Sequence, residues 1–155
     1  MSESLFEYQY LNNNASKTLF LFHGTGGTKE DFLFLNSALK DTYNLVGLQG
    51  NILENGMPRF FKRFTTTVFD QENIKVETDK LNTFISDWNQ NHKLETKNAT
   101  FLGYSNGANF LVAFLINHPD KIQNAVLLHA LLPVPLPIPN PNVAQAKLLL
   151  TAGKN

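Results

Sequence analysis

The sequence alternates short apolar runs with segments that have the apolar spacing of helices. The expected strands are residues 5–11, 18–22, 44–49, 99–104, 122–130 and 147–152. The expected helices lie between them, at residues 29–40, 72–92 and 106–117. Continuous apolar runs are typical of strands buried on both faces, and strands that alternate with helices form parallel sheets with right-handed crossovers. The pattern therefore predicts an α/β fold: a mainly parallel sheet with helices on both faces.

Length and composition restrict the functions that such a fold can have here. The 155 residues suffice for one domain but not for two, so we expect a single domain over residues 1–155. Thirteen Lys and Arg balance thirteen Asp and Glu, which leaves no basic excess to bind nucleic acid or a membrane surface. The chain has no cysteine and shows no secretory signal, and its apolar runs are far shorter than the ~20 residues of a membrane helix. These features favour a cytoplasmic protein.

The most informative motif is a G-x-S-x-G pattern between an expected strand and an expected helix, Gly103-Tyr104-Ser105-Asn106-Gly107. A nucleophilic serine projects from a sharp strand-to-helix turn, and the flanking glycines leave room for neighbouring backbone. The Asn106 N–H would point toward a developing oxyanion, helped by the partial positive charge of the helix N-terminus. A turn without chemistry is the alternative. The position of the motif between strand and helix favours Ser105 as a nucleophile.

A second glycine-rich segment follows the first buried strand, His23-Gly24-Thr25-Gly26-Gly27. It is expected at the same sheet edge as Ser105, where ligands of such sheets bind. The Thr25 N–H would be a second oxyanion donor, and His23 would hold the loop in shape. A tight turn and the phosphate loop of a flavodoxin-like nucleotide binder are the alternatives. Lys29 stands where a dinucleotide motif needs glycine, and no Gly-Lys pair of a P-loop is present.

A third segment lies between these two motifs in the sequence, Asn55-Gly56-Met57-Pro58-Arg59-Phe60-Phe61-Lys62-Arg63. Together they resemble the α/β-hydrolases of the phospholipase/carboxylesterase group, which are small bacterial serine esterases, and the resemblance covers essentially the whole chain. It implies that Ser105 is the nucleophile and that the Thr25 and Asn106 N–H groups form the oxyanion hole. It also implies small carboxylic esters or thioesters as substrates. The sequence shows no metal-ligand cluster and implies no cofactor.

Arg59 and Arg63 are the only arginines, and both adjoin phenylalanines. They could form a rim for an anionic or polar substrate. Alternatively, their stems pack over aromatic rings while the guanidinium groups bond backbone carbonyls. The aromatic surroundings favour this second role.

The histidine and carboxylate that a serine hydrolase needs are not evident. His118 is expected at the wrong end of the sheet, and His92 in a solvated polar run. His129 ends an expected strand near the correct edge, where it could anchor a loop or accept a proton. In the resembled family, the acid and histidine follow the strand equivalent to residues 148–153.

We therefore expect a truncated hydrolase fold that lacks the last strand and helix, with Ser105 chemistry impaired. A non-catalytic remnant or binding module that keeps the pocket is the alternative. An exposed C-terminal sheet edge predicts self-association and weak stability. The proline-rich residues 133–141 are expected to form an ordered loop or lid over the active edge.

Overall fold

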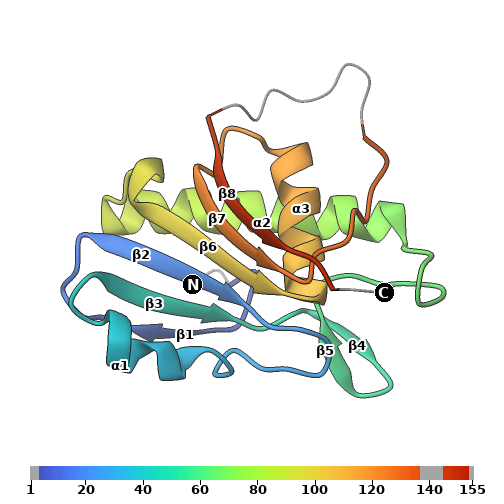
Figure 1. Ribbon diagram of the computed structural model, residues 1–155, viewed down its shortest axis with the longest axis horizontal. Helices are drawn as coiled ribbons and strands as arrows, with labels where there is room; N and C mark the ends of the chain where they lie inside the picture. The colour runs from blue at the N-terminus through green and yellow to red at the C-terminus, as the bar shows by residue number, and fades with distance from the viewer. Residues whose placement is uncertain (1–3, 137–144, 154–155) are drawn as a thin grey trace.

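The computed structural model describes residues 4–136 and 145–153. Its main sheet has the strand order β1-β3-β2-β6-β7-β8 (Figure 1). The strands are β1 (Tyr8–Leu11), β2 (Lys17–Phe22), β3 (Tyr43–Leu48), β6 (Ala99–Tyr104), β7 (Asn124–Leu128) and β8 (Lys147–Thr151). β1 pairs antiparallel with β3, and every other neighbouring pair in this sheet is parallel. The predicted mainly parallel α/β sheet is confirmed.

Two long helices, α2 (Gln71–His92) and α3 (Asn106–Asn117), cover one face of the sheet, behind the strands in Figure 1. The Asp70 side chain caps the start of α2 by accepting a hydrogen bond from the Asn73 N–H, at 3.0 Å. The buried stripe of α2 includes Ile74, Leu81, Phe84, Ile85 and Trp88. Val76, although apolar, is half exposed because it lies off this stripe. No helix within the described ranges is long and apolar enough to cross a membrane.

The opposite face is covered by much less helix than the sequence predicts. In place of a helix over 29–40, the chain forms turns, a 3-10 helix η1 (Leu33–Leu35) and a single turn α1 (Asn36–Leu39). Thr28 is one cause, because its hydroxyl bonds the Asp31 side chain and the Glu30 N–H and so favours a local turn. The apolar positions of this segment still pack on β2 and β3. A second 3-10 helix, η2 (Thr96–Asn98), leads into β6.

The segment between the expected strand 44–49 and the expected helix 72–92 contains a hairpin. Strands β4 (Ile52–Glu54) and β5 (Met57–Arg59) pair antiparallel outside the main sheet. Asn55 and Gly56 join them with φ values of 51° and 78°. An Asn-Gly pair with two positive φ values is the preferred two-residue hairpin turn, so this dipeptide was a signal that could have predicted the hairpin.

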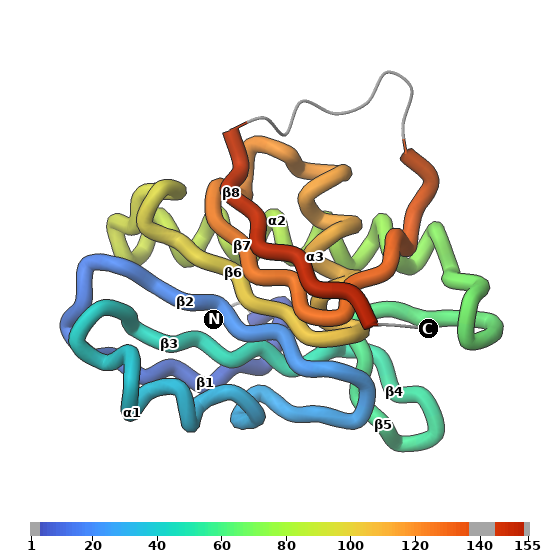
Figure 2. The backbone as a smooth tube through the Cα atoms, viewed as in Figure 1, coloured from blue at the N-terminus to red at the C-terminus, as the bar shows by residue number. Residues whose placement is uncertain are grey.

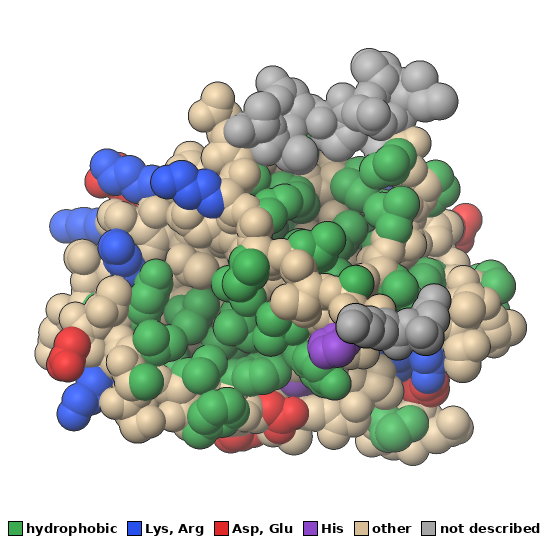
Figure 3. Space-filling view, viewed as in Figure 1, with side chains coloured by type: hydrophobic (Ala, Val, Ile, Leu, Met, Phe, Trp, Pro, Cys, Tyr) green, Lys and Arg blue, Asp and Glu red, His purple; other side chains and the backbone are tan. Residues whose placement is uncertain are grey.

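No helix among the described residues covers the front of β6, β7 and β8. Strand register places Leu102, Val126 and Leu149 in one row on this face. Figure 3 shows apolar side chains gathered over the middle of the same face. β8 is the last strand in the sheet order, beside β7 (Figure 2), and its residues Leu148, Leu149 and Leu150 are 43%, 58% and 61% exposed. Of the expected proline-rich lid, residues 137–141 lie outside the described residues.

Candidate active site

Ser105 stands at the turn between β6 and α3, with φ 50° and ψ −114°. L-residues rarely adopt this backbone conformation, and such outliers cluster at functional sites. Two backbone hydrogen bonds hold the turn: the Ser105 N–H donates to the Leu128 carbonyl, and the Ser105 carbonyl accepts from the Asn109 N–H, each at 2.9 Å. Ser105 is partly exposed at the carboxyl edge of the sheet.

The two glycines around Ser105 allow backbone segments to touch. A Cβ at Gly107 would lie 2.3 Å from the Phe22 carbonyl oxygen and 2.6 Å from that of His23. A Cβ at Gly103 would lie 2.7 Å from the backbone of the first turn of α3. The start of α3 therefore rests directly on the end of β2. This contact brings the two predicted glycine motifs together.

His23 is buried, and both of its ring nitrogens bond the backbone. The Gly50 N–H donates to Nε2 at 2.9 Å, which leaves Nδ1 as the donor to the Gly24 carbonyl at 2.6 Å. Burial lowers the pKa of His23 and so favours the neutral ring. Neither nitrogen is left to accept a proton from Ser105. Turns rather than a helix follow this loop, so it lacks the helix N-terminus that phosphate-binding loops use.

Thr25 lies on the same loop, next to the hairpin. Its hydroxyl accepts a hydrogen bond from Arg59 Nη1 at 2.5 Å, and the Gly26 N–H donates to the Pro58 carbonyl at 2.9 Å. Among the described residues, the Thr25 N–H has no acceptor. It is therefore free to donate to a ligand.

Both candidate rim arginines contact the protein itself. Arg59 is only 2% exposed, and its Nε donates to the Phe61 carbonyl at 3.2 Å. Arg63 forms a two-bond ion pair with Glu54, at 2.9 and 2.7 Å, and this bond lowers the pKa of the Glu54 carboxyl. These contacts are those of structural anchors.

Asn106 contributes a contact that the sequence did not indicate. Its buried side-chain oxygen accepts from the Phe60 N–H at 2.8 Å. Its side-chain nitrogen is buried and has no hydrogen-bond partner in the part of the chain that the structure describes. The Asn106 backbone N–H belongs to the first turn of α3, whose N–H groups have no acceptor within the helix.

The remaining histidines do not bond Ser105 in the part of the chain that is described. His129 is exposed at the same sheet edge, with φ 54° and its ring edge-on to Tyr104 at 5.7 Å between centroids. Its N–H donates to the Thr151 hydroxyl at 3.1 Å. His118 bonds Asp79 at 3.0 Å, at the far end of α3 as expected.

His92 is exposed, as expected for a solvated residue, but it also makes a contact that the sequence did not predict. Its ring stacks on Trp88 with 3.9 Å between the centroids, and its Nδ1 lies 3.0 Å from the Trp88 carbonyl oxygen.

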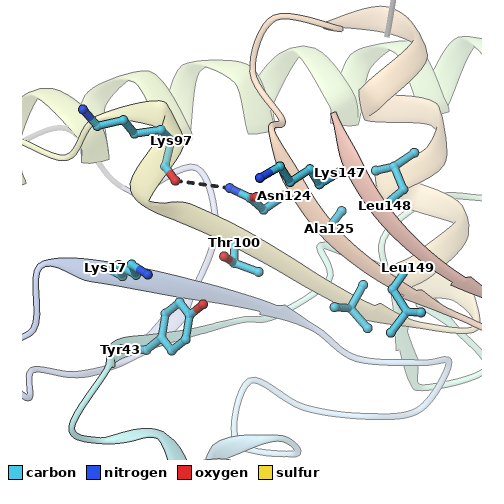
Figure 4. A pocket seen from close by; sticks show the side chains of 10 residues that line it. Lys17, Tyr43, Lys97, Thr100, Asn124, Ala125, Lys147, Leu148 and Leu149 are labelled. Carbon is cyan, nitrogen blue, oxygen red and sulfur yellow. Dashed lines mark hydrogen bonds between the residues drawn. The ribbon is translucent and has the colours of Figure 1, made fainter. Parts of the chain in front are cut away.

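A hollow elsewhere on the sheet is separate from these motifs. Figure 4 shows it at the amino ends of the strands, with Lys17, Lys97 and Lys147 around it. Asn124 bonds the Lys97 carbonyl at 3.2 Å beside it. Because Ser105 follows the carboxyl end of β6, the hollow lies at the opposite edge of the sheet.

The parallel sheet, the strained serine at the β6–α3 turn and the glycine loop beside it define an α/β-hydrolase fold. The chain has the fold of its α/β-hydrolase neighbours, although no protein-family model matches it. It is 38% identical over 125 residues to "Putative hydrolase MhqD" of Bacillus subtilis (strain 168). This match covers 81% of this chain and 62% of the relative.

Solved structures give the same assignment. The Bacillus cereus carboxylesterase is 34% identical, with a TM-score of 0.78 over 85% of this chain and 63% of the other. The Mesorhizobium loti carboxylesterase is 32% identical, with a TM-score of 0.77 over 84% and 64% of the two chains. The chain thus spans less than two thirds of the length of these relatives.

Proposed function

We propose that this chain carries the nucleophile and the oxyanion hole of a serine esterase that acts on small carboxylic esters or thioesters. The observation that carries the proposal is the positive φ of Ser105 at a strand-to-helix turn, packed against the Thr25 loop. The two similar carboxylesterases support the substrate class.

The chemistry follows from the positions of these groups. Ser105 Oγ attacks the ester carbonyl carbon, and the hydroxyl proton passes to a base. The Thr25 and Asn106 N–H groups stabilise the negative charge that forms on the carbonyl oxygen. The bond to the alcohol or thiol leaving group then breaks, and water hydrolyses the acyl-enzyme.

The rate of this reaction is limited by the supply of a base for the Ser105 proton. His23 is occupied by the backbone, and no histidine is hydrogen-bonded to Ser105 within the described residues. We therefore propose that the described site turns over esters slowly. Loss of the base typically leaves ~10³–10⁴ of rate enhancement over water, which comes from the oxyanion hole and binding.

The experiment is covalent labelling with a fluorophosphonate, followed by intact-mass and peptide analysis. Serine Oγ displaces fluoride from phosphorus, so one adduct is expected, on Ser105. The Ser105→Ala variant should keep its circular dichroism spectrum and take no label. Label that persists in Ser105→Ala, or a folded wild type that takes none, would contradict the proposal.

A second candidate is a binding module that keeps the hydrolase pocket without turnover. The absence of a histidine bonded to Ser105 in the described structure favours it. It predicts a folded wild type that takes no label but melts at higher temperature with a carboxylic acid or ester present. Slow turnover abolished by Ser105→Ala would reject it.

A further inference from the structure

Residues 58–61 lie between the two halves of the proposed oxyanion hole; we call this segment the clasp. On one side, the Pro58 carbonyl accepts from the Gly26 N–H at 2.9 Å. Arg59 Nη1 donates to the Thr25 hydroxyl at 2.5 Å on the same side. On the other side, the Phe60 N–H donates to the Asn106 side chain at 2.8 Å. Consecutive residues of the clasp thus bond both residues whose N–H groups would meet the oxyanion.

The side chains of the clasp are also tightly packed. Phe60 and Phe61 are fully buried, and Arg59 is nearly so. The Phe60 ring stacks on Phe110 of α3 at 5.2 Å and lies 4.7 Å from the His23 ring, measured between centroids. One aromatic side chain therefore contacts both the glycine loop and the helix that begins after Ser105.

Arg59 has an unusual environment for a buried cation. Within the described residues it forms no ion pair with a carboxylate. Its bonded acceptors are the Thr25 hydroxyl and the Phe61 carbonyl, and its guanidinium carbon lies 5.5 Å from the centre of the Phe61 ring. Burial of a cation costs free energy unless hydrogen bonds compensate it. One of its two hydrogen-bonded acceptors, the Thr25 hydroxyl, therefore belongs to the oxyanion loop.

Resting on the proposed function, we infer that the clasp is a positioning element, in which Arg59 fixes the Thr25 N–H relative to the Asn106 N–H. The two donors come from separate elements, a loop without regular structure and a helix. An oxyanion hole requires donors within a few tenths of an ångström of the correct distance, and a displacement of 1 Å can cost ~10²-fold in rate. Arg59 acts on the reaction only through Thr25.

The test compares the rate of fluorophosphonate labelling in four variants. Arg59→Met and Thr25→Val each remove the bond between guanidinium and hydroxyl, and Thr25→Val keeps the backbone N–H. Each should lower the maximal labelling rate by about tenfold to a hundredfold, with an unchanged concentration for half-maximal rate. The double variant should be no slower than the worse single variant, because all three lack the same bond. Lys62→Met, which removes an exposed charge from the adjacent position, should label at the wild-type rate.

The form of the change separates positioning from a folding defect. A variant that merely unfolds loses labelled fraction, whereas a misplaced donor slows labelling of the whole folded population. Additive effects of Arg59→Met and Thr25→Val, or wild-type rates in both, would overturn the inference. Loss of label in Ser105→Ala tests the proposed function separately.

A second measurement does not depend on reactivity. The backbone amide of Thr25 should have a rigid ¹⁵N–¹H heteronuclear NOE in the wild type and in Lys62→Met. It should become mobile in Arg59→Met and in Thr25→Val. An equally rigid Thr25 amide in all four proteins would also overturn the role of Arg59.

Discussion

At the scale of single residues, the approach of α3 to the end of β2 leaves no room for a side chain at Gly107. A Cβ there would meet two backbone oxygens that cannot move without shifting β2. We expect Gly107→Ala to lower the free energy of unfolding by about 1–3 kcal/mol, the usual cost of overpacking, and to displace the Ser105 turn. Urea denaturation measures the first effect.

Gly56→Ala is the matched control for that substitution. Unlike Gly107, Gly56 has a positive φ, of 78°, and nothing lies within 4 Å of its Cβ position. The backbone penalty alone should cost about 1 kcal/mol. A Gly107→Ala loss no larger than that of Gly56→Ala would contradict the requirement for glycine at the contact with β2.

His23 makes stability depend on pH in a predictable direction. Burial lowers its pKa in the folded state, so below about pH 6.5 the unfolded chain binds a proton that the folded chain does not. Its contribution is therefore complete above pH 6.5 and is lost as the pH falls toward the folded pKa. Protonation would also oppose the Gly50 N–H, which donates to Nε2.

The measurement is the difference in free energy of unfolding between wild type and His23→Gln across pH 5–8. It should shrink below pH 6.5 by up to about 1.4 kcal/mol per pH unit. The difference between wild type and Gly56→Ala, which involves no titrating group, should stay constant. A constant difference for His23→Gln as well would mean that His23 does not control the acid response.

At the scale of elements, the stability of α2 depends on its N-cap residue, Asp70. The Asp70 carboxylate accepts from the Asn73 N–H and lies near the positive end of the helix. Asp70→Ala should cost about 1 kcal/mol and lower the melting temperature, whereas Asp70→Ser should recover most of it by capping. Equal melting temperatures for Asp70→Ala and wild type would mean that packing alone fixes the start of α2.

The elements that the sequence predicts best are those with continuous apolar runs. β6 and α3 have the predicted bounds, β2 begins one residue earlier than predicted, and β3 is shifted by one residue toward the N-terminus. Burial on both faces leaves such strands few alternatives. The segment 29–40 has helical spacing too, but Thr28 offers local hydrogen bonds that compete with a helix. Apolar spacing fixes which side chains face the sheet and does not fix the backbone between them.

The site was predictable only where local sequence determines it. The strained turn at Ser105 and the glycine loop follow from short motifs, and the parallel topology places them at one edge. The contacts of Arg59 with Thr25 and of Phe60 with Asn106 join residues 34 and 46 positions apart. Such pairings depend on how the hairpin folds back, and no periodicity in one sequence encodes them.

At the scale of the whole molecule, the described residues cover one half of the front face of the sheet and leave the other half open. Residues of the segment 28–40 pack on Leu19, Leu21 and Leu45. No described helix covers the row Leu102–Val126–Leu149. Within the described residues, one backbone edge of β8 is unpaired, and such an edge can serve as a template for pairing with another chain.

We predict from this asymmetry that the 155-residue chain self-associates through β8 and melts over a broad range. Antiparallel pairing of two β8 edges would satisfy the free backbone groups and bury Leu149 of each copy, while Lys147 of one copy lies away from Lys147 of the other. Light scattering at high micromolar concentration should detect dimers or larger species. Leu149→Lys should return the protein to a monomer, because a charge on an edge strand opposes pairing.

Leu53→Lys is the matched control, since Leu53 is equally apolar and 71% exposed but lies on the β4–β5 hairpin. Both substitutions add one positive charge, so a general gain in solubility would affect them alike. Association that persists in Leu53→Lys and disappears in Leu149→Lys locates the interface at β8. A wild type that stays monomeric at the same concentration, with a sharp two-state melt, would contradict self-association through β8.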